Sequence, residues 1–278
     1  KLGFENIYHV PEQDIVDGNF PTVMSPNPEE PSALAMAVAV ADREGADLVM
    51  ATDPDADRLG VYCKDTKTGE YVGFTGNMSA MLIAEYILAE KTANGTMPEN
   101  PVFVESIVST AMGAAIAKAY DVKYVETLTG FKYIGEQIRL MEENGTGNYV
   151  FGMEESYGCL PGTYARDKDA PAAVVMLCEV AAYYKSKNMT LWDGMVEMYE
   201  KYGYYKEDGE IGIITDSAMM VEFSQQDTTF IHGDTIYSYA HGEDDKMALA
   251  YHNVRLYNNE FQGVCDSLSF CSIDSIIH

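Results

Sequence analysis

Basic residues are scarce in this chain. Its 18 Lys and Arg side chains stand against 44 Asp and Glu side chains, which gives a formal net charge of −26. Such a surface repels a nucleic-acid backbone or an anionic membrane, so we expect neither as a partner. A small anionic substrate is not excluded, because a metal ion and a few local Lys or Arg side chains can reverse the field inside one cleft.

Cysteines are few, and targeting or membrane-spanning segments are missing from the sequence. The five cysteines include no CxxC pair, and their odd number predicts neither a disulfide framework nor a cysteine metal site. No signal-peptide pattern is visible, and no apolar run approaches the roughly 20 residues of a membrane-spanning helix. We therefore expect a cytoplasmic location. The chain begins with Lys1 and residues 2–8 are already typical of structured sequence, so we expect a truncated start.

Three carboxylates alternate directly after an apolar run. Asp53, Asp55 and Asp57 follow residues 48–51, and alternate side chains of an extended loop project to the same side. Three carboxylates that converge on one point repel each other unless a cation lies between them. Hard oxygen ligands suit Mg²⁺ or Ca²⁺, and a short open loop suits Mg²⁺ beside a phosphate. The loop therefore predicts metal-assisted phosphate chemistry.

Other interpretations of this loop are weaker. Asp and Pro are common in turns, but three Asp followed by Arg58 exceed what a turn needs. An EF-hand is excluded, since its sixth position needs Gly and its twelfth needs Glu, where this chain has Arg58 and Lys64. A phosphatase of the haloacid-dehalogenase type needs Thr or Val at the position that Asp57 occupies. A metal loop that serves a phosphate carried elsewhere remains.

Residues 1 to about 206 alternate segments typical of strands and of helices, and the pattern restarts after the turn-rich stretch 93–101. This alternation favours an α/β layer architecture used twice. We predict two α/β/α domains with mixed sheets, at residues 1–98 and 99–206. The expected helices are 32–42, 77–91, 109–120 (capped by Ser109 or Thr110), 132–143, 170–186 and 190–201. The expected strands are 47–51, 60–63, 70–74, 102–106, 122–126 and 149–151, with a hairpin turn at 66–69.

Helical periodicity stops after about Gly209. Short alternating runs take over, and turn-type pairs such as His241-Gly242 and Asn258-Asn259 separate them, so residues 207–278 are predicted to form a short all-β tail. The tail contains thirteen acidic and two basic residues, and this shift in composition indicates a module of different origin. The expected strands are 211–215, 219–223, 228–232, 235–239, 248–251, 254–257 and 261–270.

Further polar motifs follow the strands of the second predicted domain. Glu154 and Ser156 lie two residues apart after a strand, where they could bind vicinal sugar hydroxyls or simply begin a helix. Thr129 and Gly130 could approach a ligand through their backbone or could cap a helix, and Lys132 could neutralise a phosphate or shuttle a proton. The mixed-charge cluster at residues 166–169 is either a solvated loop or a phosphate clamp. Gly76-Asn77 most simply begins a helix.

The order of these motifs is more specific than any one of them. The order is 52–58, 129–132, 152–158 and 166–169, preceded by Phe-Pro-Thr at 20–22 and Ser-Pro-Asn-Pro-Glu at 25–29. Over about residues 1–206 this succession resembles the α-D-phosphohexomutase superfamily. The Glu-Glu-Ser-Tyr-Gly form is most similar to the phosphoglucomutase branch, including members that accept mannose phosphates.

The resemblance implies a Mg²⁺-dependent hexose-phosphate mutase of four domains, of which this chain carries the second and third. The substrate would be glucose or mannose 1- or 6-phosphate, and a phosphoryl group would pass through a hexose 1,6-bisphosphate. The implied metal ligands are Asp53, Asp55 and Asp57. The implied catalytic residues are Arg58, Lys132 and Lys168, and the implied substrate-binding residues are Thr129, Gly130, Glu154, Ser156 and Arg166.

The chain departs from the family pattern at both ends. It contains no Thr-Ala-Ser-His-Asn-Pro loop and no Arg-Pro-Ser-Gly-Thr loop, so we expect a fragment that is not a competent mutase by itself. The tail motifs 230–235, 250–255 and 262–268 resemble OstA-like lipopolysaccharide-transport proteins, which would imply a periplasmic location. This combination suggests a chimera joined near 207–210. A non-catalytic sugar-phosphate-binding module and an envelope β-scaffold protein remain the alternatives.

Overall fold

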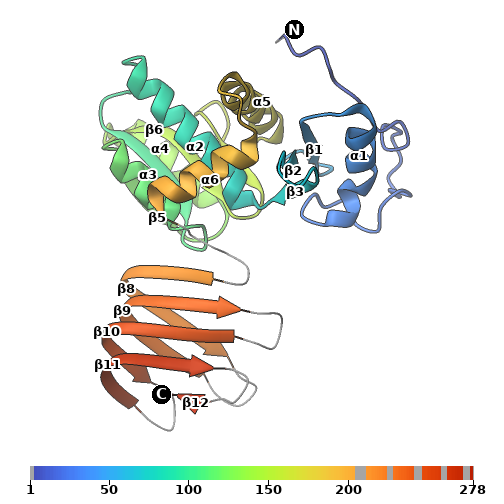
Figure 1. The fold of residues 1–278 in the computed structure, drawn as a ribbon. Coiled ribbons are helices and arrows are strands. Elements are labelled where there is room, and N and C mark those ends of the chain that lie inside the picture. Colours follow the sequence, from blue (N-terminus) through green and yellow to red (C-terminus); the bar gives the residue numbers. More distant parts are fainter. Residues whose placement is uncertain are drawn as a thin grey trace. The chain divides into compact units, whose positions relative to one another are not determined.

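The computed structural model describes residues 3–203, 211–223, 228–240, 246–257, 262–271 and 276–277. The chain divides into two compact units, Lys1–Tyr202 and Gly203–His278 (Figure 1). The first unit contains two sheets and all six described helices, and the second contains one sheet. This agrees with the predicted α/β fold with mixed sheets followed by an all-β tail.

The first sheet is an antiparallel meander in the order β1-β2-β3. Its strands are β1 (Leu48–Thr52), β2 (Leu59–Lys64) and β3 (Tyr71–Phe74), so the predicted hairpin over 60–74 is confirmed. Helix α1 (Pro31–Glu44) begins with Pro31 in its first turn, and its C-cap residue Gly45 has a φ of 69°, in the left-handed region that favours glycine. The helix packs on β1 through Leu34, Ala41 and Val49.

The second sheet is mixed and has the order β5-β4-β6-β7. Strands β4 (Pro101–Ser106), β5 (Lys123–Thr127) and β6 (Asn148–Glu154) are parallel, and β7 (Gly158–Leu160) returns antiparallel beside β6. The short strand β7 was not expected from the sequence. Because β4, β5 and β6 are parallel, Ser106, Thr127 and Glu154 lie at the same edge of the sheet, where α/β proteins bind ligands.

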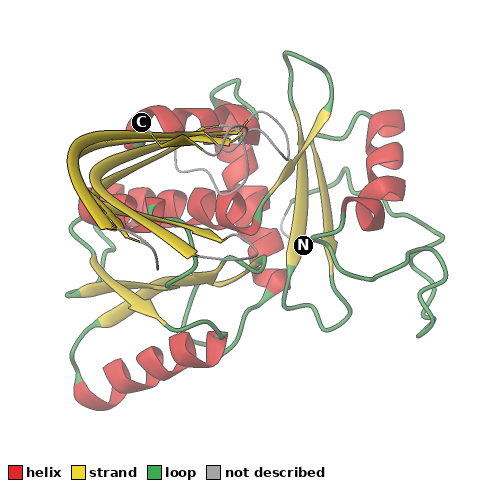
Figure 2. Ribbon diagram, turned by 90° about the horizontal axis from the view of Figure 1, so that it is seen from below, coloured by secondary structure: helices red, strands yellow, loops and turns green. Residues whose placement is uncertain are grey.

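Helices cover both faces of the second sheet (Figures 1 and 2). On one face, Val102 and Val104 pack against Ile134 and Ile138 of α4 (Phe131–Asn144). Phe103 alternates with these valines and therefore lies on the opposite face, where its ring contacts Phe151 at 5.4 Å between centroids. The remaining helices of the unit are α2 (Gly76–Ala93), α3 (Met112–Ala119), α5 (Ala170–Ser186) and α6 (Leu191–Tyr202).

Helix α2 is buried on several sides. It packs against α3, α5, α6 and β6, and also against β2 and β3 of the first sheet. A helix that contacts neighbours all round needs apolar residues all round, which explains why the apolar residues of 77–91 extend beyond one face. The predicted domain boundary at 98/99 falls in the connection between α2 and β4. That boundary remains a prediction.

The predicted start of the helix at 109–120 was wrong. Helix α3 begins at Met112, and its N-cap residue Ala111 offers no side-chain hydrogen bond. The Ser109 hydroxyl is instead 2.8 Å from the Ser106 hydroxyl, at the end of β4. The Thr110 hydroxyl accepts a hydrogen bond from the Met112 N–H at 3.4 Å, but this contact closes a short turn before the helix.

The second unit is an antiparallel sheet in the order β12-β11-β10-β9-β8. Its strands are β8 (Ile211–Phe223), β9 (Thr228–Ala240), β10 (Lys246–Tyr257), β11 (Gln262–Cys271) and β12 (Ile276–Ile277). The seven predicted runs merge into fewer strands, because the breaks at 216–218 and 252–253 are register shifts rather than turns. The turn pairs at 241–242 and 258–259 lie outside the described residues. Among the described helices, none has the length and apolarity to cross a membrane.

Candidate functional site: two acidic loops joined by a lysine

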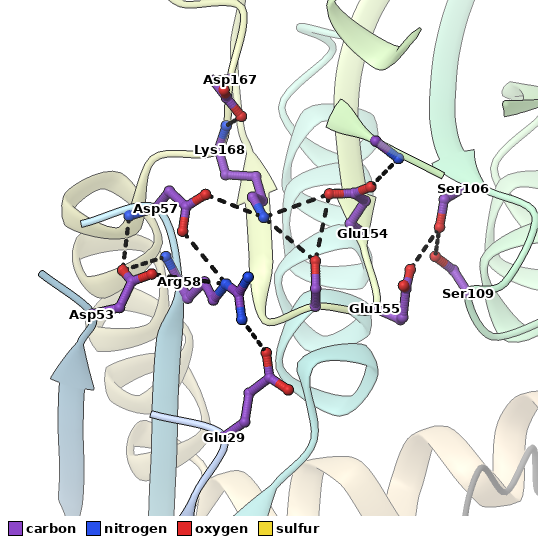
Figure 3. Close-up of polar contacts among 12 residues, drawn as sticks. Glu29, Asp53, Asp57, Arg58, Ser106, Ser109, Glu154, Glu155, Asp167 and Lys168 are labelled. Atoms are coloured by element: carbon purple, nitrogen blue, oxygen red, sulfur yellow. Dashed lines mark hydrogen bonds and ion pairs between the residues drawn. The ribbon is translucent and has the colours of Figure 1, made fainter. Parts of the chain in front are cut away.

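The first acidic loop connects β1 to β2. One Asp53 carboxylate oxygen accepts the backbone N–H groups of Asp57 and Arg58, each at 3.0 Å, and this closes the loop on itself. Ala56 adopts a φ of 58° at the turn, a conformation that a side chain disfavours. As a result, one carboxylate oxygen from each of Asp53, Asp55 and Asp57 lies within 4.8 Å of the others. The three side chains thus converge on one point, and their role as metal ligands remains a prediction. Figure 3 shows two of them, Asp53 and Asp57.

The electrostatics of this loop fit a hard cation. Burial raises the pKa of Asp53, the backbone N–H of Arg58 opposes the shift, and the neighbouring Asp57 and Asp55 carboxylates raise the pKa further. One oxygen of Asp57 is buried and accepts no hydrogen bond. Crowded, partly buried carboxylate oxygens are the ligand type that Mg²⁺ takes in proteins. Asp53, Asp55 and Asp57 therefore fit a divalent cation, and which cation binds remains a proposal.

Arg58 is held on the acidic loop by carboxylates from both sides. Its guanidinium lies 2.8 Å from Glu29, 3.8 Å from Asp53 and 3.7 Å from Asp57. Glu29 belongs to the Pro-Asn-Pro-Glu segment, which packs so closely on β2 that a Cβ at Gly60 would lie 2.5 Å from the Pro28 carbonyl oxygen. The 26–29 segment thus fixes the direction of Arg58.

The second acidic loop connects β6 to β7. Glu154 is the last residue of β6, and its carboxylate accepts the backbone N–H of Gly130 and lies 3.5 Å from the Ser156 hydroxyl. Gly130 has a φ of 113°, which L side chains rarely adopt, so glycine is required where the chain turns toward Glu154. The structure therefore brings together Gly130, Glu154 and Ser156, three of the predicted substrate-binding residues.

Lys168 joins the two acidic loops (Figure 3). Its ammonium group lies 3.2 Å from Asp57 in the first loop, and 3.5 Å from Glu154 and 3.4 Å from Ser156 in the second. The Lys168 side chain is only 8% exposed. A Cβ at residue 158 would lie 2.0 Å from Lys168 Cδ, so Gly158 provides the space that the lysine stem occupies.

Backbone hydrogen bonds also connect the segments of this site. The Leu59 N–H donates to the Tyr157 carbonyl at 2.8 Å, and the Ala170 N–H donates to the Ala56 carbonyl at 3.0 Å. Asp169 caps α5 by accepting the Ala172 N–H at 3.0 Å, which fixes the turn immediately after Lys168. The arrangement of the acidic loops therefore does not depend on the lysine alone.

Three predicted site residues have other contacts. The Lys132 ammonium lies 4.8 Å from the centre of the Tyr133 ring. Arg166 lies 2.6 Å from Glu142 and donates to the Thr163 and Ala165 carbonyls. Thr129 is exposed and does not cap α4, whose N-cap residue is Gly130. Among residues 3–203, none of these three side chains forms a hydrogen bond or ion pair with Lys168 or Glu154, and their roles stay predictions.

Sequence reasoning missed the support behind the second acidic loop. The Ser106 hydroxyl donates to Glu155 at 2.8 Å, and Asn77, inside α2, accepts the Thr110 N–H at 3.3 Å. A Cβ at Gly76 would lie 2.2 Å from the Glu155 carbonyl oxygen, so the start of α2 fits directly against this loop. A pair of hydroxyls at the carboxyl end of a strand was the available sequence signal for Ser106 and Ser109. Gly76-Asn77 was predicted only to begin a helix, which α2 confirms, and the contact of the Asn77 side chain with Thr110 was not predicted.

Two family models match the chain. "Phosphoglucomutase/phosphomannomutase, alpha/beta/alpha domain II" matches residues 1–69, and the corresponding domain III model matches residues 75–202. Both acidic loops lie within these matches. The matched ranges stop at Tyr202, where the first compact unit also ends.

Curated relatives show the same extent of similarity. The human glucose 1,6-bisphosphate synthase is 40% identical over 209 residues, which cover 73% of this chain and 33% of the relative. The phosphoglucomutase of Staphylococcus haemolyticus is 36% identical over 206 residues, which cover 74% of this chain and 36% of the relative. The chain thus spans about a third of the length of these relatives.

A solved structure supports the fold. The crystal structure of a phosphoglucomutase/phosphomannomutase family protein from Burkholderia thailandensis matches with a TM-score of 0.52 and 18% identity, covering 90% of this chain and 50% of that one. At this identity the match concerns the fold alone.

Proposed function

The chain belongs to the α-D-phosphohexomutase superfamily, of which it carries domains II and III, and we propose that residues 1–202 form the metal-binding and sugar-binding parts of a hexose-phosphate phosphotransfer site. In a complete site of this kind, the phosphoryl group passes between C1 and C6 of a hexose through the 1,6-bisphosphate. A cytoplasmic location belongs to the same proposal.

One observation carries this proposal. Lys168 contacts Asp57 in the first acidic loop and Glu154 in the second acidic loop, so motifs about a hundred residues apart in the sequence meet at one point. A bisphosphorylated sugar requires this combination, since a cation neutralises its phosphate while carboxylate and hydroxyl groups bind its ring. A turn or a solvated charge cluster would not require it.

Each group has a role in the proposed site. Asp53, Asp55 and Asp57 would hold Mg²⁺, which neutralises charge on a transferring phosphoryl group when it is bound. Arg58, directed by Glu29, would hold the phosphorylated side of the site. Glu154 and Ser156 would bind the sugar hydroxyls, with Thr129 and Gly130 positioning the ring. Lys132 and Lys168 would contact the substrate or transfer protons, and Arg166 would contact a phosphate after leaving Glu142.

Calorimetric titration of the full chain tests the proposal. We expect Mg²⁺ to bind with one-to-one stoichiometry and glucose 1,6-bisphosphate to bind in its presence. Asp55→Asn should weaken Mg²⁺ binding roughly tenfold or more, because ligand charge sets the affinity of such sites. Asp42→Asn is the matched control, since Asp42 is 72% exposed on α1 and pairs only loosely with Lys64, at 3.7 Å. Equal Mg²⁺ binding by the two variants would refute the metal site.

We further propose that the chain of residues 1–278 does not interconvert hexose phosphates by itself. Its sequence contains no Thr-Ala-Ser-His-Asn-Pro-type loop that could carry the phosphoryl group. Turnover of glucose 1-phosphate to glucose 6-phosphate by the purified chain, abolished in the Asp55→Asn variant, would overturn this. Sugar-bisphosphate binding without turnover would agree with the alternative of a non-catalytic binding module.

The β-sheet unit carries no functional proposal. The family matches end at Tyr202, and no comparison supports the OstA-like resemblance of the tail or the envelope-scaffold alternative. The predicted junction at 207–210 lies outside the described residues. Whether one continuous transcript spans this junction would test the chimera hypothesis.

A further inference from the structure

The Asp57 carboxylate is already engaged by basic side chains. One of its oxygens lies 3.2 Å from the Lys168 ammonium, and the other lies 3.7 Å from the Arg58 guanidinium. Asp57 is also one of the three residues whose oxygens converge in the acidic loop. The same carboxylate therefore faces a lysine and the point where a cation would bind.

Lys168 has a second set of acceptors within reach. Glu154 lies 3.5 Å and Ser156 lies 3.4 Å from the same ammonium group, so the lysine can leave Asp57 without losing all its partners. Glu154 is 7% exposed and Lys168 is 8% exposed. A buried ammonium needs a nearby carboxylate, which confines the lysine to positions between these two acids.

We propose that Lys168 competes with a divalent cation for Asp57, and that binding of the cation releases the ammonium group to Glu154, Ser156 and an anionic sugar ligand. This inference rests on the proposed function and adds a coupling between its two parts. The lysine then links binding of a cation at the first acidic loop to binding of a sugar ligand at the second acidic loop.

The physical basis is repulsion between two cations at one carboxylate. A divalent cation near Asp57 makes the position of Lys168 beside Asp57 unfavourable, while Glu154 and a phosphate attract the ammonium to the other side. Coupling of binding free energies is reciprocal. If the bound cation strengthens binding of the sugar ligand by releasing Lys168, the sugar ligand must strengthen binding of the cation by the same factor. Removal of the ammonium should therefore tighten metal binding and weaken ligand binding.

Calorimetric titration with Mg²⁺ alone decides whether loss of the Lys168 charge tightens or weakens cation binding. We expect Lys168→Met to bind Mg²⁺ at least threefold more tightly than the unaltered chain. Lys185→Met is the matched control, because Lys185 lies at the opposite end of α5, pairs with Asp47 and is 71% exposed. Its Mg²⁺ affinity should stay within twofold of that of the unaltered chain. Thermal melting confirms that each variant is folded.

A second variant shifts the lysine the other way. Glu154→Gln removes the alternative carboxylate, so Lys168 should remain on Asp57 and Mg²⁺ should bind at least threefold more weakly. If Lys168 only positions Asp57 for the metal, Lys168→Met should instead bind Mg²⁺ more weakly. That result, or unchanged Mg²⁺ binding in Lys168→Met, would overturn the inference.

Titration with glucose 1,6-bisphosphate completes the cycle. In the unaltered chain, the sugar bisphosphate should strengthen Mg²⁺ binding severalfold, and this factor should be smaller in Lys168→Met. Absence of any Mg²⁺ binding that depends on Asp55 defeats the proposed function and this inference together. Normal binding of both ligands, with the same coupling factor in Lys168→Met, defeats this inference alone.

Discussion

Lys201, in the last turn of α6, lies 2.7 Å from the Glu85 carboxylate on α2. The same carboxylate accepts the hydroxyl groups of Tyr120 at 2.7 Å and Tyr202 at 2.6 Å. Glu85 thus connects α2, the end of α3 and the end of α6. The side chain is only 13% exposed, so water competes little for these contacts.

Loss of the Glu85 charge should destabilise the first unit. We expect Glu85→Gln to lower the free energy of unfolding by roughly 1–3 kcal/mol, because it weakens several hydrogen bonds to a charged acceptor. Glu143→Gln is the control, since its pair with Arg139 is exposed on α4 and should cost at most about 0.5 kcal/mol. Urea denaturation followed by circular dichroism measures both. Equal losses in the two variants would contradict the importance of this cluster.

A methyl group at residue 158 should disturb Lys168. In Gly158→Ala the new Cβ would lie 2.0 Å from Lys168 Cδ and 3.0 Å from the Asp57 carbonyl oxygen, so the lysine stem must move. We expect a loss of about 1–3 kcal/mol in the free energy of unfolding, as for overpacked cores. Gly18→Ala serves as the control, because nothing lies within 4 Å of its Cβ. A neutral Gly158→Ala would show that the lysine is placed differently.

Removal of the Ser106 hydroxyl should loosen the second acidic loop. Ser106→Ala leaves Glu155 without its 2.8 Å donor and Ser109 without its partner, and should cost about 1–2 kcal/mol of stability. Because Glu155 is adjacent to Glu154, sugar-bisphosphate binding should also weaken severalfold while Mg²⁺ binding stays nearly unchanged. Ser106→Thr keeps the hydroxyl and should restore most of the binding. A proportional loss of both ligands would instead indicate general unfolding.

The buried thiol of Cys159 should make the first unit sensitive to alkaline pH. Burial raises the pKa of Cys159 to about 12, with a smaller contribution from the Asp169 charge, whereas an unfolded thiol titrates near 9. The unfolded chain therefore loses this proton first, so the stability that the protonated thiol provides is complete below pH 9 and declines from there toward 12. Urea midpoints measured between pH 7 and pH 10 should fall less steeply in Cys159→Ala.

The same burial should protect Cys159 from alkylation. The thiolate is the reactive form, and a thiol with a raised pKa in a closed site presents very little of it. Differential alkylation at pH 8 followed by mass spectrometry should label exposed Cys265 first and Cys159 only after addition of urea. Rapid labelling of Cys159 in the native chain would contradict its burial.

The sequence predicted the elements of the first unit well, because apolar periodicity and turn residues are local signals. The Asp53–Asp57 convergence was also accessible, since it depends on a short loop after a strand. The position of Lys168 between the two acidic loops could not be predicted from local sequence, because it results from β7 returning beside β6 and from the space at Gly158. In the same way, Arg166 contacts Glu142 of α4, which only tertiary packing brings near.

The tail shows a different limit of sequence reasoning. Polar residues at 216–217 and 252–253 interrupt the apolar alternation, and such interruptions are typical of turns. In the structure the chain continues in the same strand and changes its register against the neighbour. Local composition does not distinguish an irregular strand from two short ones, because the partner strand decides the outcome.

The close fit of Gly76 against the Glu155–Tyr157 backbone limits how the first unit can move. A hinge between the two sheets would have to separate the start of α2 from the second acidic loop, and would also break the Leu59–Tyr157 and Ala56–Ala170 hydrogen bonds. These contacts oppose bending between the two sheets. Residues 1–202 are therefore expected to accommodate a ligand by rearranging side chains rather than by a hinge between the sheets.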